Sequence, residues 1–269
     1  MISESLFRQC SRVKQSIFCL FETVKTVYAQ NHWIEIYEAP HKSPLKRDKI
    51  YEQETTIFLR KHLQKGQTVW DVGANIGYFS LEFARSVGPK GKVLSFEPHP
   101  EIFQVLQRNI RRNNYLNIIT HNQACGSSLG ETKLYFSTEN EGNHKIIENS
   151  NSNNFAITPV VTLSTFLKEY SPSLIKMDIE GAELLALQGL GQENLKNLAI
   201  DFVIEYHPYE MTFFDIEGVQ VLDFFMSSGY KFRNLAYSDY PIISKKEILK
   251  KYKKEDRSIT NLFCSKSID

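Results

Sequence analysis

The sequence contains few cysteines, and they form no recognisable pattern. The four among 269 residues are Cys10, Cys19, Cys125 and Cys264, and no two of them have the C-x-x-C spacing of a zinc site. Their long, irregular separations also argue against the dense disulfide framework of small secreted domains. We therefore expect buried free thiols in a reducing compartment.

Excess charge and long hydrophobic runs are lacking as well. The formal net charge is +1, so composition provides no attraction to nucleic acid or acidic membranes. Near the N-terminus, charged residues interrupt every apolar stretch before a secretion signal could form. No stretch approaches the roughly 18 apolar residues of a membrane span. We expect a cytoplasmic protein with no membrane span and no nucleic-acid partner.

What the chain does contain is a regular alternation of strand-like and helix-like segments. Strands are predicted over residues 68–72, 92–96, 117–121, 174–177 and 200–205, with two more near 230–235 and 260–264. Helices are predicted over residues 51–63, 76–87, 101–113, 164–170, 182–187 and 219–228. This order predicts an α/β fold: a Rossmann-like, mostly parallel seven-stranded sheet with helices on both faces.

Residues 1–47 are predicted to form an N-terminal helical appendage to the main domain of residues 48–269. Apolar residues recur every three or four positions over residues 4–30, which predicts an amphipathic helix, and residues 33–37 resemble a short strand. The helix could dock on the domain, form a homodimer contact or lie on a membrane. Its few basic residues favour docking or dimerisation.

The most informative segment is Thr68-Val-Trp-Asp-Val-Gly-Ala-Asn-Ile-Gly77, an apolar strand followed by a glycine-containing turn. Gly73 and Gly77 allow a ligand to approach the backbone, and Ala74 and Asn75 line the turn. The arrangement differs from the dinucleotide pattern G-x-G-x-x-G, because Asp71 stands first. An aspartate would repel a pyrophosphate, but it suits a cationic head such as the ammonium group of S-adenosylmethionine (SAM).

A second acidic residue follows at a diagnostic distance. Glu97 ends the next apolar run, 20 residues after Gly77. This is about the offset at which an acidic side chain binds both hydroxyls of a ribose. Together, the two acids predict a nucleoside ligand that needs no phosphate.

Four segments carry a resemblance to a known family. DVGANIGYFSLEFA, GKVLSFEPHP, LIKMDIEGAELLALQGL and VIEYHP follow one another along the chain, and together they resemble the FkbM-type SAM-dependent methyltransferases. The resemblance extends from about Tyr51 to the C-terminus. It implies a final antiparallel pair of strands and transfer of a methyl group to a hydroxyl of a sugar, glycan or polyketide-like natural product.

The resemblance also implies further cofactor contacts. Gln123 occupies the place where related enzymes contact the adenine amino group, and the backbone of Ala124 could contact the ring. Tyr51 and Glu52 match the family pattern and are expected to border the cofactor pocket.

The candidate catalytic residues follow two neighbouring strands. Asp178 and Glu180 come after the fourth predicted strand, and Glu205 and His207 end the fifth, where open α/β sheets place their ligands. Removing a proton from a hydroxyl requires a base. We prefer Asp178 and then His207 as this base, with Glu180 and Glu205 orienting the acceptor, while Asp178 could also contact the methionyl part of SAM.

Metal binding is not predicted. Asp178, Glu180 and Glu205 are oxygen ligands of the kind that Mg²⁺ accepts, so Mg²⁺ stays open but is not favoured. The unpatterned segment 139–159, rich in Asn and Ser, predicts a mobile flap near the acceptor site or a disordered loop.

Other functions remain as alternatives. An NAD-dependent oxidoreductase would need the missing G-x-G-x-x-G, and a base-modifying methyltransferase usually shows a proline–proline–aromatic motif where this chain has IEGAE. A non-catalytic SAM-binding or scaffold protein, or a methyltransferase for another class of acceptor, would share the same cofactor residues. Turnover with a hydroxylated acceptor separates these alternatives.

Overall fold

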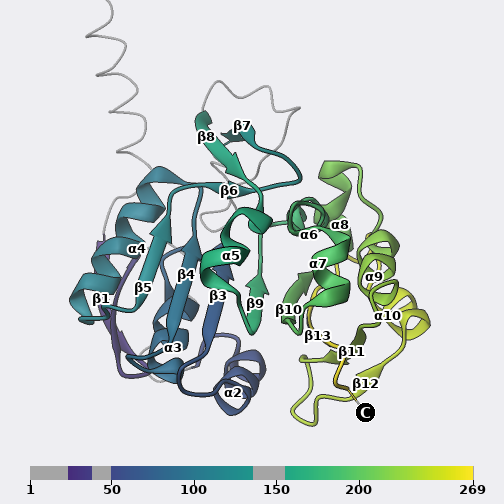
Figure 1. Ribbon diagram of the computed structural model, residues 1–269, viewed down its shortest axis with the longest axis horizontal. Helices are drawn as coiled ribbons and strands as arrows, with labels where there is room; N and C mark the ends of the chain where they lie inside the picture. The colour runs from purple at the N-terminus through teal and green to yellow at the C-terminus, as the bar shows by residue number, and fades with distance from the viewer. Residues whose placement is uncertain (1–23, 38–49, 136–154, 269) are drawn as a thin grey trace, which may run out of the picture.

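An eight-stranded sheet runs through the centre of the computed structural model, which describes residues 24–37, 50–135 and 155–268 (Figure 1). The strand order is β12-β11-β13-β10-β9-β3-β4-β5. Five neighbouring strands are parallel: β10 (Asp201–Tyr206), β9 (Leu174–Met177), β3 (Thr68–Val72), β4 (Lys92–Phe96) and β5 (Ile118–His121). This confirms the predicted mostly parallel sheet.

The C-terminal part of the sheet is antiparallel. It contains β13 (Thr260–Ser265), β11 (Lys231–Asn234) and the two-residue β12 (Ile242–Ile243). The pairing of β11 with β13 confirms the expected antiparallel pair. The short β12 is the eighth strand of this sheet, which the sequence did not predict.

The predicted helices are present with small shifts of their ends. They are α2 (Gln53–His62), α3 (Tyr78–Val87), α4 (Pro100–Arg112), the 3₁₀ helix η1 (Leu163–Phe166) continuing into α5 (Leu167–Tyr170), α6 (Glu183–Leu190) and α9 (Gly218–Met226). The structure adds α7 (Gln192–Asn197), α8 (Pro208–Met211), the 3₁₀ helix η2 (Thr212–Phe214) and α10 (Lys245–Lys251). Of these, α8 matters most for function, because it begins directly after β10.

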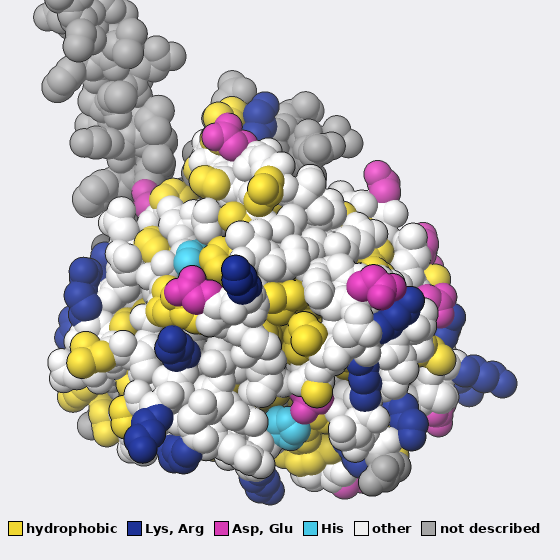
Figure 2. Space-filling view, in the orientation of Figure 1, with side chains coloured by type: hydrophobic (Ala, Val, Ile, Leu, Met, Phe, Trp, Pro, Cys, Tyr) yellow, Lys and Arg dark blue, Asp and Glu magenta, His cyan; other side chains and the backbone are white. Residues whose placement is uncertain are grey.

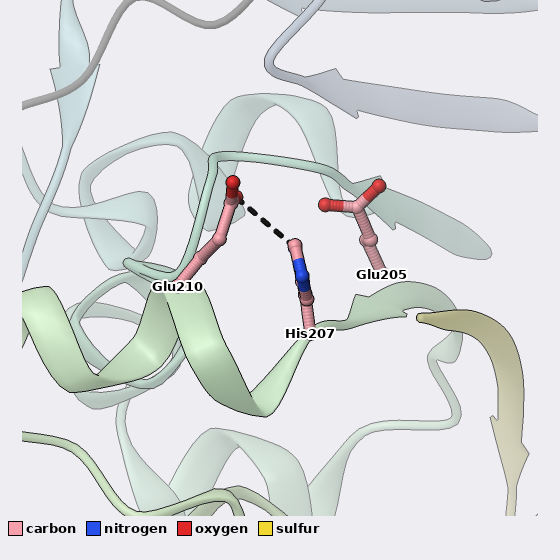
Figure 3. A group of neighbouring side chains, drawn as sticks. All are labelled: Glu205, His207 and Glu210. Carbon is pink, nitrogen blue, oxygen red and sulfur yellow. Dashed lines mark ion pairs between the residues drawn. The ribbon is translucent and has the colours of Figure 1, made fainter. Parts of the chain in front are cut away.

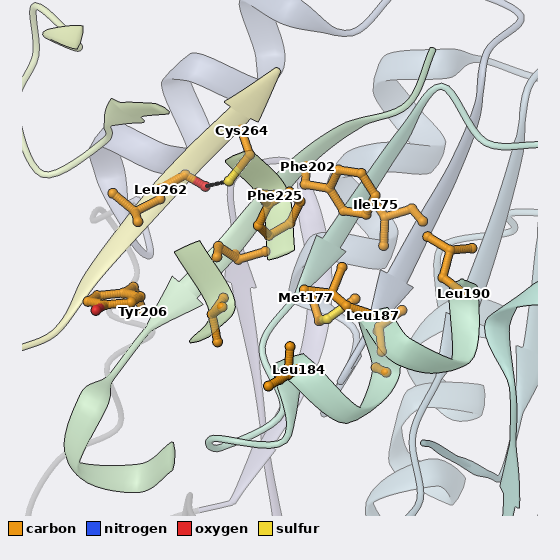
Figure 4. Close-up of a cluster of buried hydrophobic side chains, with 14 of the residues drawn as sticks. Ile175, Met177, Leu184, Leu187, Leu190, Phe202, Tyr206, Phe225, Leu262 and Cys264 are labelled. Atoms are coloured by element: carbon orange, nitrogen blue, oxygen red, sulfur yellow. Dashed lines mark hydrogen bonds between the residues drawn. The ribbon is translucent and has the colours of Figure 1, made fainter. Parts of the chain in front are cut away.

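Alternate side chains of the central strands enter two different cores, as a two-residue period requires. Trp70, Ile175 and Phe202 are fully buried in one cluster with residues of α6 and α9, and Figure 4 shows part of this cluster, including Ile175 and Phe202. Val69 and Leu174 pack on the opposite face, with α2, α3 and α4. Each such side chain contributes about 1.5–3 kcal/mol through burial, so the parallel strands form a rigid base for the residues at their ends.

The N-terminal part that is described is a β-hairpin, so the predicted helix over residues 4–30 is wrong for its last residues. Strands β1 (Val24–Ala29) and β2 (His32–Tyr37) pair antiparallel. Gln30 and Asn31, both with positive φ, form the two-residue turn between them. Residues 4–23 lie outside the described part of the chain, so the remaining helix, its dimer contact and the domain boundary at residue 47 stay predictions.

The hairpin is fixed to α4 by polar contacts. The Asn109 side chain accepts a hydrogen bond from the backbone N–H of Glu35 (2.7 Å) and donates to the carbonyl oxygens of Glu35 (3.2 Å) and Ile76 (2.8 Å). Arg108 also pairs with the Glu35 carboxylate, at 2.7 Å. Through its three hydrogen bonds, Asn109 couples the hairpin to the turn that follows β3. Trp33 of β2 stays 51% exposed, whereas Trp70 of β3 is fully buried.

A separate three-stranded sheet lies beside the main one. Its central strand is β8 (Phe155–Val161), flanked by β6 (Ala124–Cys125) and β7 (Gly130–Tyr135). The prediction of a flap or disorder is therefore wrong for residues 155–159, which form part of a strand, while residues 139–154 lie outside the described part of the chain. Cys125, like Cys264, is a buried free thiol, as predicted.

The surface agrees with the near-neutral composition. On the face that Figure 2 shows, basic and acidic side chains lie interspersed rather than separated. Among the helices that the structure describes, none is long and apolar enough to cross a membrane.

Candidate functional site

The turn after β3 is built around two glycines in the left-handed region. Gly73 has φ +86° and Gly77 has φ +94°, and Gly77 immediately precedes α3. The N–H groups of Gly73 and Ala74 both donate to the carbonyl oxygen of Phe96, at 3.0 and 2.9 Å. A Cβ atom at Gly73 would lie 1.9 Å from the carbonyl oxygen of Asp178. Glycine is therefore required here by the backbone conformation and by the close approach of the loop after β9.

Glu97 is fixed beside this turn. Its two carboxylate oxygens accept backbone N–H bonds from Asn75 and His99, both at 2.8 Å. The side chain is buried, and burial raises the pKa of Glu97 to about 7. Each carboxylate oxygen has a second lone pair, so a ligand hydroxyl could still donate to it. This position at the carboxyl end of β4 is the one expected for a ribose contact.

Asp71 lies beneath the turn rather than on its surface. Its Oδ2 atom accepts a hydrogen bond from Ser80 of α3, and Ser80 is bonded in turn to Ser95 of β4 at 2.8 Å. The Oδ1 atom is buried and has no hydrogen-bond partner among the described residues. A cationic ligand head, or a water molecule bridging to one, would satisfy this oxygen. The position fits the water-mediated form of the predicted ammonium contact better than a direct one.

Lys176 was not predicted as part of the site. It lies on β9 directly opposite Asp71 of β3, and its side chain is only 2% exposed. The ammonium group bonds the Oδ2 atom of Asp178 at 2.9 Å and lies 4.4 Å from the centre of the Phe79 ring. The one sequence signal was a lysine in the otherwise apolar strand Leu174-Ile-Lys-Met177.

Tyr51 and Glu52 reach the same region from the start of α2. Glu52 accepts a hydrogen bond from Asn261 at 2.7 Å. Burial, and then the charges of Glu52 and Asp178, raise the pKa of Tyr51. The charge of Asp178 acts on both Tyr51 and Glu52, so both residues lie near Asp178. Their contact with the cofactor remains a prediction.

The expected adenine contacts lie where β5 leads into β6. Ala124 begins β6 and is buried, and Gln123 precedes it with partial exposure. The neighbouring Asn122 donates to the carbonyl oxygens of Glu97 and Pro98, at 2.8 and 3.1 Å. This segment is therefore attached to the one that carries the ribose candidate, and the roles of Gln123 and Ala124 remain predictions.

The loop after β9 carries two candidate acids. Glu180 and Gly181 both have positive φ, and the turn is held by Glu183, whose Oε1 atom accepts from the N–H groups of Ile179 (3.0 Å) and Gly181 (3.4 Å). Glu183 is buried, and burial raises its pKa to about 7. Glu183 therefore holds the loop on which Glu180 is presented.

Three ligating side chains meet at the end of β10 (Figure 3): Glu205, His207 and Glu210, with one ligand atom of each within 4.8 Å of the other two. The Nδ1 atom of His207 lies 3.4 Å from a carboxylate oxygen of Glu210, which is buried on α8. Burial, followed by the charges of Asp178, Glu180 and others, raises the pKa of Glu205 well above its ordinary value. This shift indicates that the acids after β9 lie near Glu205.

Glu210 is a site residue that the sequence reasoning missed. Pro208 occupies the first helical position of α8, so Glu210 returns to the side of His207 three residues later. A cluster of two glutamates and a histidine could hold a transition metal more readily than Mg²⁺. The sequence had left Mg²⁺ binding by Asp178, Glu180 and Glu205 open, but among the described residues the group close enough to share a metal is Glu205, His207 and Glu210 instead.

Comparison with known proteins decides the family. The Methyltransferase FkbM domain matches residues 71–232, more than half of the chain. The chain belongs to the FkbM methyltransferase family. The matched range includes the glycine turn, Glu97, the loop after β9 and the His207 cluster.

Individual relatives have low sequence identity to this FkbM protein. Methyltransferase sdnD of Sordaria araneosa is 29% identical over 177 residues, which cover 52% of this chain and 68% of that protein. Hexuronic acid methyltransferase AglP of Haloferax volcanii is 30% identical over 149 residues, covering 54% and 58%. A crystal structure of an FkbM methyltransferase from Methylobacillus flagellatus KT has a TM-score of 0.50 at 19% identity, over 78% of this chain and 47% of that one, which supports the fold alone.

The residues of the site fit SAM, the methyl donor of the family. Gly73 and Gly77 keep the turn open to a ligand, Glu97 presents a carboxylate at its edge, and Asp71 has one buried oxygen without a described partner. We conclude that the FkbM chain is a SAM-dependent methyltransferase, and the assignment of its cofactor residues to the turn after β3 stays a prediction.

Proposed function

We propose that this FkbM protein is an O-methyltransferase that acts on a hydroxyl group of a sugar, glycan or polyketide-like natural product. The observation that carries the proposal is His207, which stands at the end of β10 with Glu210 beside its Nδ1 atom. The name of AglP supports a sugar-like acceptor, because that relative is a hexuronic acid methyltransferase.

His207 is the better base of the two sequence candidates. Its Nε2 atom makes no hydrogen bond to any described residue, so its lone pair can take the proton of an acceptor hydroxyl that reaches it, while the Glu210 carboxylate would stabilise the resulting imidazolium. Asp178 is already engaged by Lys176. We therefore reverse the order that the sequence suggested and assign Asp178 to the methionyl end of the cofactor.

The remaining residues position the acceptor. SAM supplies an activated methyl group, so the protein must align the hydroxyl and accept its proton. Glu205 lies beside His207, and Glu180 is presented by the strained turn after β9. We assign both to hydrogen bonds with acceptor hydroxyls.

The test is methyl transfer from labelled SAM to a panel of neutral sugars, uronic acids and polyketide alcohols. With an accepted substrate, His207→Gln should lower kcat about 10²–10⁴-fold, the usual contribution of a general base. The matched control is His62→Gln. His62 also pairs with a carboxylate, that of Asp201 at 3.0 Å, but at the opposite end of β10.

The outcomes separate the candidate functions. An unchanged kcat in His207→Gln would remove His207 as the base. Binding of SAM without turnover on any acceptor would favour the non-catalytic alternative, and transfer to nitrogen rather than oxygen would identify another acceptor class.

A further inference from the structure

Lys176 is a buried cation that the methyl-transfer chemistry does not use directly. It occupies the middle of the sheet, between Asp71 on β3 and Val203 on β10. Its ammonium group bonds Asp178 at 2.9 Å and lies over the Phe79 ring. Isolated buried charges are very unfavourable, so this lysine must be stabilised by the acids around it.

We propose that Lys176 is a positioning residue: bonded to Asp178 and paired across the strands with Asp71, it supplies the positive charge that keeps Asp71 and Glu52 ionised, and it thereby fixes the charge of the pocket end that receives the amino-acid head of SAM. The ammonium group of Lys176 is bonded to Asp178, the residue is paired across the strands with Asp71, and its charge acts on Glu52. The excess of negative charge is complementary to the ammonium group of the cofactor.

The electrostatics of the buried groups agree with this geometry. Burial raises the pKa of Asp71 and of Glu52, and the charge of Lys176 opposes the rise in both cases. Burial also acts against the charge of Lys176, but Asp178, Glu52 and Asp71 together raise its pKa above the ordinary value. Lys176 is therefore a permanent cation and cannot be the base that takes the hydroxyl proton.

Without the lysine, Asp71 and Glu52 would lose their buried counter-charge. The pKa values of these two carboxyls would rise further, so a larger share of them would be protonated at neutral pH. A neutral carboxyl binds the cationic head poorly, so recognition of the head would be lost at low pH and recovered at high pH. The titratable groups that share this environment and must be considered are Tyr51, Glu52, Asp71, Glu97, Asp178 and Glu205.

The experiment compares two probes by calorimetric titration between pH 6 and 8.5. S-adenosylhomocysteine carries the amino-acid head, and 5′-methylthioadenosine lacks it but keeps the same nucleoside. The ratio of their association constants isolates recognition of the head, because effects of Glu97 on the ribose cancel. Dividing the ratio of a variant by that of the wild type removes titration of the ligand's own amino group.

The wild-type ratio should change little between pH 6 and 8. In Lys176→Met, the ratio should rise about tenfold or more between pH 6.5 and 8.5, one decade for each carboxyl that must lose its proton. Lys176→Met combined with Asp178→Asn serves as the second variant. It removes the directly bonded partner along with the lysine, and it should show the same rise because Asp71 and Glu52 remain.

A merely structural lysine would give a different pattern. Both ligands would then weaken together, and the ratio would stay parallel to that of the wild type at every pH. Such parallel curves, or a wild-type ratio that already rises about tenfold between pH 6 and 8, would overturn the proposal. No acceptor is needed, so this result is independent of whether O-methylation is correct.

Discussion

We predict that the pKa of Glu97 makes cofactor affinity sensitive to pH in the neutral range. Binding of a ribose diol requires the ionised carboxylate, because both hydroxyls donate to it. Burial raises the pKa of Glu97 from 4.5 to about 7. The sign follows directly: the binding form predominates above pH 7 and is lost as the pH falls below 7.

The size of the effect follows from the ionised fraction. About half of the Glu97 carboxyls are ionised at pH 7 and about a tenth at pH 6, and the apparent Kd scales inversely with that fraction. The Kd for S-adenosylhomocysteine should therefore rise about fivefold between pH 7 and pH 6, and about tenfold between pH 6 and pH 5. Removing the carboxylate in Glu97→Ala should cost at least about tenfold, or 1.4 kcal/mol, at pH 8 through lost charge-assisted bonds.

Calorimetric titration of the wild type and Glu97→Ala across pH 5–8 measures both effects. The variant should bind weakly with a flatter pH profile, so that the difference between the two profiles belongs to Glu97 and not to Glu183, which titrates in the same range. Glu131→Ala, which removes an exposed acid from β7, is the matched control. A wild-type Kd that is constant between pH 6 and 8, or a Glu97→Ala variant with unchanged affinity, would refute the ribose assignment.

Three further predictions concern the turn, the hairpin and the metal question. Gly73→Ala should destabilise the fold by more than about 3 kcal/mol in urea denaturation, because its Cβ atom would collide with the carbonyl oxygen of Asp178. Gly66 has the same φ of +86° but open space around it, so Gly66→Ala should cost only about 1–2 kcal/mol. Similar losses of stability in the two variants would contradict the collision. Asn109→Ala breaks three hydrogen bonds and should lower the free energy of unfolding by about 2–4 kcal/mol. Amide hydrogen exchange should become faster in the β1–β2 hairpin, and an unchanged exchange pattern would contradict this prediction. Dialysis against EDTA should leave methyl transfer unchanged, because a metal on His207 would occupy the proposed base. Activity that is lost and then restored by Zn²⁺ or Mn²⁺ would contradict this.

The central sheet could be predicted because buried parallel strands appear as continuous apolar runs with clear ends. The glycine turn, Glu97 and the acids after β9 follow directly from those runs, so their positions were predictable too. Lys176 was not recognised, since a single charge inside an apolar run carries no partner information. Its partner Asp71 is about a hundred residues away in sequence and becomes adjacent only through strand pairing.

Other errors have local physical causes. The last residues of the expected N-terminal helix fit a strand as well, because a short apolar segment does not distinguish the two periods. Gln30 and Asn31 have the positive φ values that a two-residue hairpin turn requires and that a helix excludes. Strand β8 was missed because its first residues continue an Asn- and Ser-rich segment that shows no strand periodicity. Glu210 could be found only by recognising Pro208 as a helix start.

The two tryptophans of the chain are intrinsic fluorescence probes in different environments. Trp33 is half exposed on the hairpin, while Trp70 is fully buried and donates to the carbonyl oxygen of Tyr170 at 2.9 Å. A water-soluble quencher should therefore extinguish the emission of the first and leave that of the second, whose indole lies one residue before Asp71. Release of the hairpin and opening of the cofactor turn should then appear as separate fluorescence changes in unlabelled protein.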